Sequence, residues 1–306
     1  MHASREIRFV KYHAAANDFV VVSAAELALG SAIKTPPAQL TPLARAILDR
    51  HTGVGADGLF VAWRATGSNR AAVRIFNADG SEAEMSGNGI RCAAAWLLEG
   101  KSMIKQIEIE TAAGLKTLER VQDNGETMVF RVAMGGPILD PQRIPFRGPA
   151  AAAPVVGYSL PTSLGPRQVS VSSMGNPHCS TFVDSFDELD WRALGREMER
   201  HPFFPNRTNV EFIRVLGQNR IEVRFWERGV GETLSSGTGS SAAAVASILN
   251  QKTRRRVAVE TPGGTLNVEW KQSDEVFLTG PVRRIAAGKF EYHEEANARK
   301  SGRFRR

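Results

Sequence analysis

An internal repeat constrains the fold of this chain more than any other feature of its sequence. Similar residues return 150 positions later: Val73-Arg74 as Val223-Arg224, and Ser86-Gly-Asn-Gly89 as Ser236-Gly-Thr-Gly239. Single matches of this kind carry no weight, but a constant offset kept over about forty residues is hard to obtain by chance. We therefore expect two structurally similar halves.

The sequence of each copy of the repeat predicts the same order of strands and helices. An alternating strand, 72–76 or 221–226, leads into a polar loop, and the loop ends in Ser-Gly-X-Gly at the start of a helix, 90–98 or 240–249. The first helix has a single charge, Arg91, and the second has none. A helix without a polar face is buried on all sides. Alternation resumes at 107–110, 257–260 and 276–278.

These patterns predict an α+β protein of two pseudo-symmetric domains, each a curved, mostly antiparallel sheet around one central helix. We expect an N-terminal half at 1–142, joined by the last strand at about 283–295, and a C-terminal half at 143–282. The segment 143–166 is rich in Pro, Gly and Ala and is expected to be the passage between the halves. Residues 296–306 form a basic tail.

Composition excludes several classes of protein. The net charge is +7, but the tail carries five of those charges, and without them 34 basic residues face 32 acidic ones. Neither the tail nor the basic cluster at 252–256 carries a nucleic-acid-binding motif, so we expect no nucleic-acid partner. No apolar run approaches the ~18 residues of a membrane span, and the N-terminus has no signal-peptide pattern. With only two cysteines, the chain is expected to be a soluble cytoplasmic protein that meets no membrane.

The two Ser-Gly-X-Gly turns are the strongest functional signal. Glycines let backbone N–H groups approach a ligand, and a helix N-terminus attracts an anion, most simply a carboxylate held from both sides. Ser86 and Ser236 would then flank that ligand across a cleft between the halves. The alternative is that both serines are plain helix N-caps.

Further polar residues gather near the predicted strand ends. They are Asn17, Asn77, Asn176, His178, Asn209, Glu227 and Arg228. Each one could be an ordinary turn residue or surface ion pair. Together they suit a zwitterionic small-molecule substrate with a second charged end, which Arg228 could bind as a carboxylate.

Other chemistries fit poorly. The sequence has no Gly-X-Ser-X-Gly elbow, no P-loop and no complete dinucleotide fingerprint. Its six histidines form no pair at i, i+4 spacing. We expect no metal and no cofactor.

Five blocks resemble the diaminopimelate epimerase family. They are 9–19, 77–92, 175–179, 208–212 and 227–239, and they occur in the family's order. The resemblance implies two pseudo-symmetric domains with the active site between them, and a possible homodimer. It also implies cofactor-independent interconversion of LL- and meso-diaminopimelate, a step of lysine and cell-wall precursor biosynthesis, by two-base transfer of the α-proton.

The resemblance also implies roles for individual residues. The family's two proton-transfer cysteines fall on Ser86 and Ser236, and His178 and Glu227 would be their polar neighbours. The turn residues Gly87, Asn88, Gly237 and Thr238 would hold the α-carboxylate. The residues around the rest of the substrate would be Asn17, Asn77, Asn176, Asn209, Glu227 and Arg228.

Serine at both proton-transfer positions changes the expected chemistry. A thiol has a pKa near ~8.5, and a helix N-terminus can lower it, whereas an alcohol is a far weaker acid and a poor base at neutral pH. We therefore predict epimerisation that is very slow or absent. Ala14 and Ala16 stand where the family usually has glycine, and Gly58 where it usually has glutamine.

Three explanations of these departures remain open. The chain is a double Cys→Ser variant that traps substrate, or a diverged racemase or dehydratase of another amino acid that uses His178 or Glu227, or an amino-acid-binding protein without catalysis.

Overall fold

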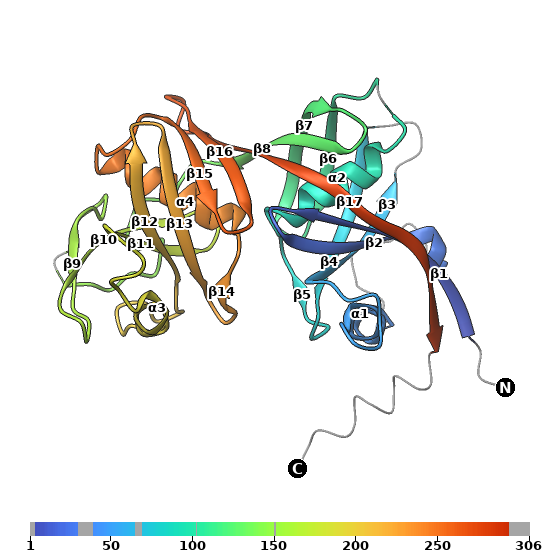
Figure 1. The fold of residues 1–306 in the computed structure, drawn as a ribbon, viewed down its shortest axis with the longest axis horizontal. Helices are drawn as coiled ribbons and strands as arrows, with labels where there is room; N and C mark the ends of the chain where they lie inside the picture. The colour runs from blue at the N-terminus through green and yellow to red at the C-terminus, as the bar shows by residue number, and fades with distance from the viewer. Residues whose placement is uncertain (1–3, 30–38, 65–68, 102, 150, 294–306) are drawn as a thin grey trace, which may run out of the picture. The chain divides into compact units, whose positions relative to one another are not determined.

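The computed structural model describes residues 4–29, 39–64, 69–101, 103–149 and 151–293, and it divides into two compact units (Figure 1). Unit 1 comprises 1–130 and 281–306, and unit 2 comprises 131–280. Two strands, β8 (Thr127–Gly135) and β17 (Val276–His293), run from one unit into the other. The basic tail at 296–306 lies outside the described residues.

Unit 1 is built from strands joined by two helices. Its elements are β1 (Ser4–Ala14), β2 (Asn17–Ser23), a 3-10 turn η1 (Ala24–Leu27), α1 (Leu40–Leu48), β3 (Gly58–Arg64), β4 (Arg70–Asn77), β5 (Glu82–Ala83), α2 (Gly89–Leu98), β6 (Gln106–Thr111) and β7 (Gly114–Asp123). Strand β1 is antiparallel to β2 and β17, β2 is parallel to β3, and β3 is antiparallel to β4. Strand β4 is antiparallel to β5 and parallel to β6, which is antiparallel to β7.

Unit 2 repeats this plan. Its elements are β9 (Tyr158–Leu160), β10 (Arg167–Ser173), β11 (Pro177–Phe182), α3 (Trp191–Glu199), β12 (Asn209–Gly217), β13 (Arg220–Glu227), β14 (Gly231–Thr233), α4 (Gly237–Leu249), β15 (Arg256–Thr261) and β16 (Gly264–Trp270). Strand β10 is antiparallel to β9 and β11, β11 is parallel to β12, and β12 is antiparallel to β13. Strand β13 is antiparallel to β14 and parallel to β15, which is antiparallel to β16.

The two units therefore share one topology. The pairings from β1 through β7 alternate between antiparallel and parallel in the same order as those from β10 through β16. An outer helix, α1 or α3, follows the second strand of each set, and a central helix, α2 or α4, follows the fifth. The predicted fold of two similar α+β halves is confirmed.

The central helices are buried as expected. Every residue of α2 except Trp96 is buried, and the same is true of α4 except for Thr238, Ile248 and Leu249. Figure 1 shows each helix among the strands of its own unit. These helices carry few polar side chains, as is typical of helices that are buried on all sides.

The last glycine of each Ser-Gly-X-Gly turn is required by this packing. A Cβ on Gly89 would come within 2.5 Å of the Phe60 ring, and a Cβ on Gly239 within 2.9 Å of the Phe225 ring. These glycines therefore allow the helix to approach the sheet.

The segment 143–166, expected to be the passage between the halves, contributes to the core of unit 2. Ile144, Phe146, Val155 and Leu160 pack there with residues of β10, β11 and α3. The chain instead changes unit inside β8, between Phe130 and Arg131. The Pro, Gly and Ala content of 143–166 predicted a linker. That prediction is wrong because the apolar side chains spaced along the segment pack into the hydrophobic core of unit 2.

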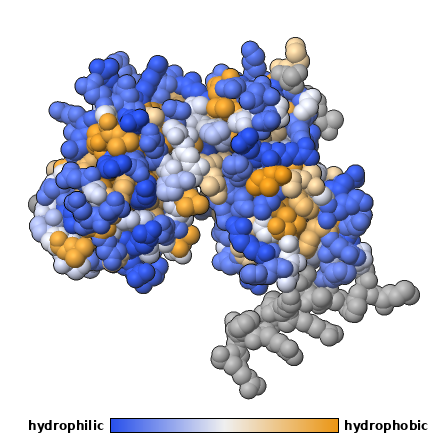
Figure 2. Space-filling view, in the orientation of Figure 1, coloured by the Kyte–Doolittle hydropathy of each residue, from blue (hydrophilic) through white to orange (hydrophobic). Residues whose placement is uncertain are grey.

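The visible face of each unit is mostly hydrophilic, with small scattered apolar patches (Figure 2). None of the described helices is long and apolar enough to span a membrane.

Candidate functional site

Each unit contains one set of the predicted site residues. We call the turn 86–89 with Asn17 and Asn77 half-site 1, because all of them lie in unit 1. We call the turn 236–239 with Asn176, His178, Asn209, Glu227 and Arg228 half-site 2, because all of them lie in unit 2.

The two serines cap their helices in the same way. Ser86 Oγ accepts a hydrogen bond from the N–H of Gly89 at 3.0 Å, and Ser236 Oγ accepts one from the N–H of Gly239 at 3.2 Å. The carbonyl of each serine accepts the next helical N–H, that of Ile90 or Ser240, at 2.9 Å. A cap of this type uses an acceptor lone pair and leaves the hydroxyl proton for another partner.

In half-site 1 the sheet register brings Asn77 beside the helix. Phe19 pairs with Gly58 across the parallel strands β2 and β3, and Gly58 pairs with Asn77 across β3 and β4. The Phe19 ring also lies against Gly89, 2.9 Å from the place of its Cβ. Asn17, two residues before Phe19, and Asn77 thus end up at the edge of the sheet where α2 begins.

An ionic network holds Asn17. Its amide donates to Asp57 at 2.6 Å, and Arg50 pairs with Asp57 at 2.7 Å and with Asp18 at 3.1 Å. Lys11 pairs with Asp18 at 2.8 Å. These cations lower the pKa of Asp18 against the effect of burial, so its carboxylate stays charged.

The buried charge of half-site 1 is Arg91, which is 0% exposed. Its guanidinium donates to the carbonyl of Gly87 at 3.2 Å and to Oδ1 of Asn88 at 2.9 Å, and its Nε has no hydrogen-bond partner. Burial lowers the pKa of Arg91 to about 10, so it is still a cation at neutral pH.

In half-site 2, Glu227 lies beside Ser236. Thr233 donates its hydroxyl to Glu227 Oε1 at 2.7 Å. Burial raises the pKa of Glu227, and Thr233, His178 and Ser236 offset part of this effect. Ser236 is thus both a helix cap and a neighbour of a carboxyl group.

A buried chain of hydrogen bonds fixes Asn176. Glu211 Oε1 lies 2.6 Å from His178 Nδ1, and His178 Nε2 lies 2.8 Å from Asn176 Oδ1. The amide nitrogen of Asn176 then faces the Thr238 hydroxyl at 3.5 Å. Because acceptors occupy both ring nitrogens of His178, the arrangement favours a positioning role for this histidine over a role as a free base.

Asn209 connects this chain to Arg228. It pairs with His178 across the parallel strands β11 and β12, its amide donates to the carbonyl of Pro177 at 2.9 Å, and its Oδ1 accepts the N–H of Arg228 at 2.9 Å. The side chain of Arg228 is exposed and donates to the carbonyl of Asn206 at 3.3 Å.

Three residues that position these groups were missed as site residues in the sequence analysis: Arg91, Glu199 and Glu211. Buried Glu199 accepts the N–H of Gly229 at 2.9 Å and the indole N–H of Trp226 at 3.1 Å, and so holds the turn that carries Arg228. A signal existed only for Arg91, since a lone charge on a helix predicted to be buried must itself be buried. Glu199 and Glu211 lie far along the chain from the groups they hold.

The positions that depart from the family pattern have structural consequences. Ala16 has φ 63°, in the left-handed region, where glycine is favoured. Any side chain at position 58 would meet the Phe19 ring 2.9 Å from its Cβ, so glycine fits the surrounding structure there.

Neither native cysteine is suited to proton transfer. Cys92 and Cys179 are both buried and unpaired. Burial raises the pKa of Cys92 to about 12 and that of Cys179 well above its usual value. Among the described residues, no group of His, Cys, Asp and Glu could hold a metal ion.

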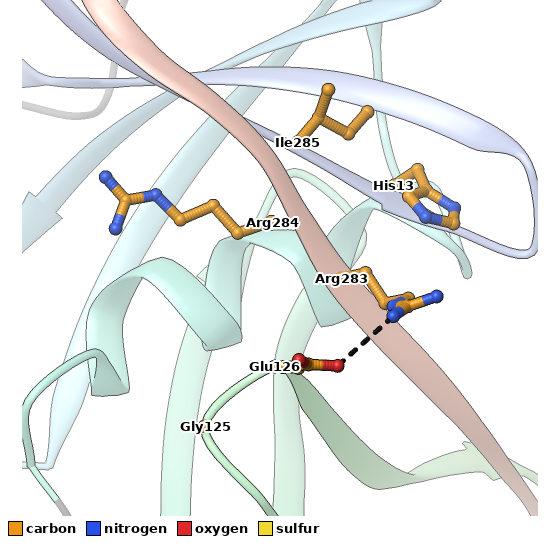
Figure 3. Close-up of a pocket in the computed structure, with 6 residues that line it drawn as sticks. All are labelled: His13, Gly125, Glu126, Arg283, Arg284 and Ile285. Carbon is orange, nitrogen blue, oxygen red and sulfur yellow. Dashed lines mark hydrogen bonds and ion pairs between the residues drawn. The ribbon is translucent and has the colours of Figure 1, made fainter.

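A hollow in unit 1 is lined by His13, Gly125, Glu126 and residues 283–285. Figure 3 shows Arg283 and His13 on one side of β17 and Arg284 on the other. Arg283 pairs with Glu126 at 3.4 Å. None of the predicted site residues lines this hollow, so we do not assign it to the site.

Comparisons with known proteins agree with this geometry. Residues 9–139 and 170–285 match the family model described as diaminopimelate epimerase. The chain is 42% identical over 288 residues to a diaminopimelate epimerase of Pelotomaculum thermopropionicum, covering 94% of this chain and 99% of the relative. It is also 42% identical over 288 residues to one of Synechocystis, covering 93% and 99%.

Solved structures show the same fold at low identity. A hydroxyproline epimerase from Agrobacterium vitis, with trans-4-hydroxy-L-proline bound, aligns with a TM-score of 0.66 at 14% identity, covering 97% of this chain and 96% of that one. A probable proline racemase from Agrobacterium radiobacter aligns with a TM-score of 0.64 at 16% identity, covering 92% of each chain.

Proposed function

This chain belongs to the diaminopimelate epimerase family, a family of isomerases, and we propose that its two half-sites bind one molecule of LL- or meso-diaminopimelate. The turns 86–89 and 236–239 hold the α-carboxylate through Gly87, Asn88, Gly237 and Thr238. Asn17, Asn77, Asn176, Asn209, Glu227 and Arg228 bind the remaining polar groups. The proposal is supported most directly by the pair of matching capped turns, each beside its own set of polar side chains.

The proposed reaction is inversion of the α-carbon by two groups. The residue on one face removes the α-proton, and the residue on the other face delivers a proton to the resulting planar carbanion, so the substrate gains and loses one proton. With Ser86 and Ser236 in these positions the removing group would be an alkoxide, which is scarcely populated at neutral pH. We therefore propose that the chain binds its substrate and epimerises it very slowly or not at all.

Glu227 supports one alternative. A half-buried carboxyl group whose pKa burial raises, and which accepts a hydrogen bond from Thr233, is suited to acid–base work at the half-site 2 face. A diverged racemase or dehydratase could use this group. His178 is less suited to such a role because Glu211 and Asn176 occupy its ring nitrogens.

The test is exchange of the α-proton of LL-diaminopimelate in D2O, followed by NMR. The parent chain is compared with the double variant Ser86→Cys, Ser236→Cys and with each single variant. General acid–base catalysis contributes about 10²–10⁴ in rate, so we expect the double variant to exceed the parent by at least about a hundredfold. Each single variant is the matched control: one thiol can remove the α-proton and return a deuteron on the same face, so it can support exchange, but only the double variant should also convert LL- into meso-diaminopimelate.

The outcomes separate the hypotheses. Exchange only after restoration supports an epimerase silenced by its serines. Binding in a calorimeter without exchange in any variant would indicate a binding protein. Exchange by the parent that is lost in Glu227→Gln would favour the diverged enzyme. Absence of both binding and exchange would contradict the proposed substrate.

A further inference from the structure

Arg91 makes more interactions than the turn of half-site 1 requires. Its guanidinium bonds the Gly87 carbonyl, and the equivalent position in unit 2 is Ser241, whose hydroxyl bonds the equivalent carbonyl of Gly237 at 2.9 Å. A small neutral hydroxyl is therefore enough to satisfy a turn carbonyl at this place in the fold. The guanidinium adds a positive charge and a second hydrogen bond, to Oδ1 of Asn88.

The charge is buried without a counter-ion. No carboxylate of the described residues forms an ion pair with Arg91, and the one titratable group that acts on it is Cys92. The Cys92 thiol is neutral, because burial raises its pKa to about 12. An isolated buried charge destabilises a fold, so Arg91 calls for an anionic partner that the described residues do not supply.

Half-site 2 has the opposite character. Glu227 lies against Ser236, and Glu211 is 0% exposed and adjacent to His178. The fully buried ionisable groups that distinguish the two half-sites are thus a cation, Arg91, in unit 1 and a carboxyl group, Glu211, in unit 2.

We propose that Arg91 is a positioning residue that orients the Asn88 amide and supplies half-site 1 with a fixed positive charge, so that an acid at position 86 ionises more readily than one at position 236. The same charge also favours binding of the substrate's α-carboxylate, and this second effect rests on the proposed function. The part that concerns position 86 needs no substrate.

The test uses introduced thiols as probes of the local field. The single variants Ser86→Cys and Ser236→Cys are alkylated with iodoacetamide over a range of pH, which gives the pKa of each new thiol. Cys92 and Cys179 are buried and should not react. A nearby opposite charge shifts a pKa by about 1–3 units. We expect the thiol at position 86 to titrate below the one at position 236.

Substitution of Arg91 separates charge from shape. Arg91→Met should raise the pKa of the position 86 thiol by at least about one unit and leave the position 236 thiol unchanged, whereas Arg91→Lys should retain most of the depression. Ser241→Ala is the matched control, since it removes the equivalent bond without changing charge and should shift neither thiol.

Several results would overturn the proposal. They are an unchanged position 86 thiol in Arg91→Met, an equal shift of both thiols, or Arg91→Lys behaving like Arg91→Met. Thermal unfolding is measured for every variant, and failure of both Arg91 variants to fold would assign the residue a structural role instead.

Calorimetry with LL-diaminopimelate distinguishes this proposal from the proposed function. If the parent binds and Arg91→Met binds at least about tenfold more weakly, the carboxylate role is supported. If the parent binds and Arg91→Met binds equally well, that role is wrong. If the parent does not bind at all, the proposed function fails, while the thiol titration still decides whether Arg91 sets the field at position 86.

Discussion

The two half-sites share a backbone and differ in their buried charge. In each, a serine caps a central helix from a glycine-containing turn, and the last glycine allows the helix to pack against a phenylalanine ring. Yet Arg91 in unit 1 corresponds to Ser241 in unit 2, and Asn77 corresponds to Glu227. Backbone geometry is constrained by close packing in both copies, whereas side-chain charge is free to diverge after duplication. The comparison indicates that the repeat preserves a scaffold and that each half-site has its own electrostatics.

The largest expected effect on stability is at the buried contact between Glu211 and His178 in half-site 2. Glu211→Gln replaces a buried carboxyl oxygen that hydrogen-bonds His178 or Ser180, and a buried polar group left unsatisfied costs about 1–3 kcal/mol, more where the lost bond is to a charged group. We expect such a loss in urea unfolding. Asp57→Asn in the more exposed network of half-site 1 should cost about 1 kcal/mol or less. Equal losses would show that burial does not distinguish the two networks.

The next largest difference in stability is expected between alanine substitutions of Gly89 and Gly239, the glycines that let the central helices pack against the sheet. Gly89→Ala places its Cβ 2.5 Å from the Phe60 ring, against 2.9 Å from the Phe225 ring for Gly239→Ala. Overpacking costs about 1–3 kcal/mol, and we expect the loss to be greater for Gly89→Ala. Gly217→Ala, with open space around the position, is the control and should stay within about 0.5 kcal/mol. Thermal unfolding measures the stability of all three variants. A greater loss for Gly239→Ala than for Gly89→Ala would contradict the prediction from the Cβ distances.

Glu227 should give half-site 2 a pH dependence that the neutral Asn77 cannot give half-site 1. Burial raises the folded-state pKa of Glu227 above the ordinary value of 4.5. Between the two values the folded state binds more protons than the unfolded state, so this residue's contribution to stability falls as pH rises. Glu227→Gln should therefore gain stability relative to the parent as pH is raised from 4.5. Unfolding at a series of pH values tests this, with Asn77→Gln expected to show no such trend.

The smallest effect concerns the hairpin turns before Asn17 and Asn176. Ala16 has φ 63° where the matching turn of unit 2 has Gly175 at φ 99°. Left-handed backbone costs an alanine about 1 kcal/mol, partly offset by the entropy of glycine in the unfolded chain. Ala16→Gly should stabilise by about 0.5 kcal/mol, and Gly175→Ala should destabilise by about 1 kcal/mol. Denaturation midpoints measure both changes in stability. If both substitutions changed stability in the same direction, the two turns would not be equivalent.

Much of the fold could be predicted from the sequence because the relevant signals are local. The repeat, the strands around each turn and the nearly uncharged central helices depend on patterns within a few residues, and the described elements confirm them. The prediction for 143–166 depended on composition alone, and its apolar residues pack into the core of unit 2 instead. The roles assigned to the site residues stay predictions that the experiments above address.

The sequence by itself determined the duplicated architecture, the two Ser-Gly-X-Gly turns and the presence of serine at positions 86 and 236, because these follow from residue identity and short-range periodicity. Only the tertiary structure decided which charges are buried together. The parallel pairing of β11 with β12 brings Glu211 to His178, 33 residues apart, and within the described part of the chain no carboxylate pairs with Arg91 on α2. Such pairings depend on strand register and on exclusion of water, neither of which is encoded in any one stretch of chain.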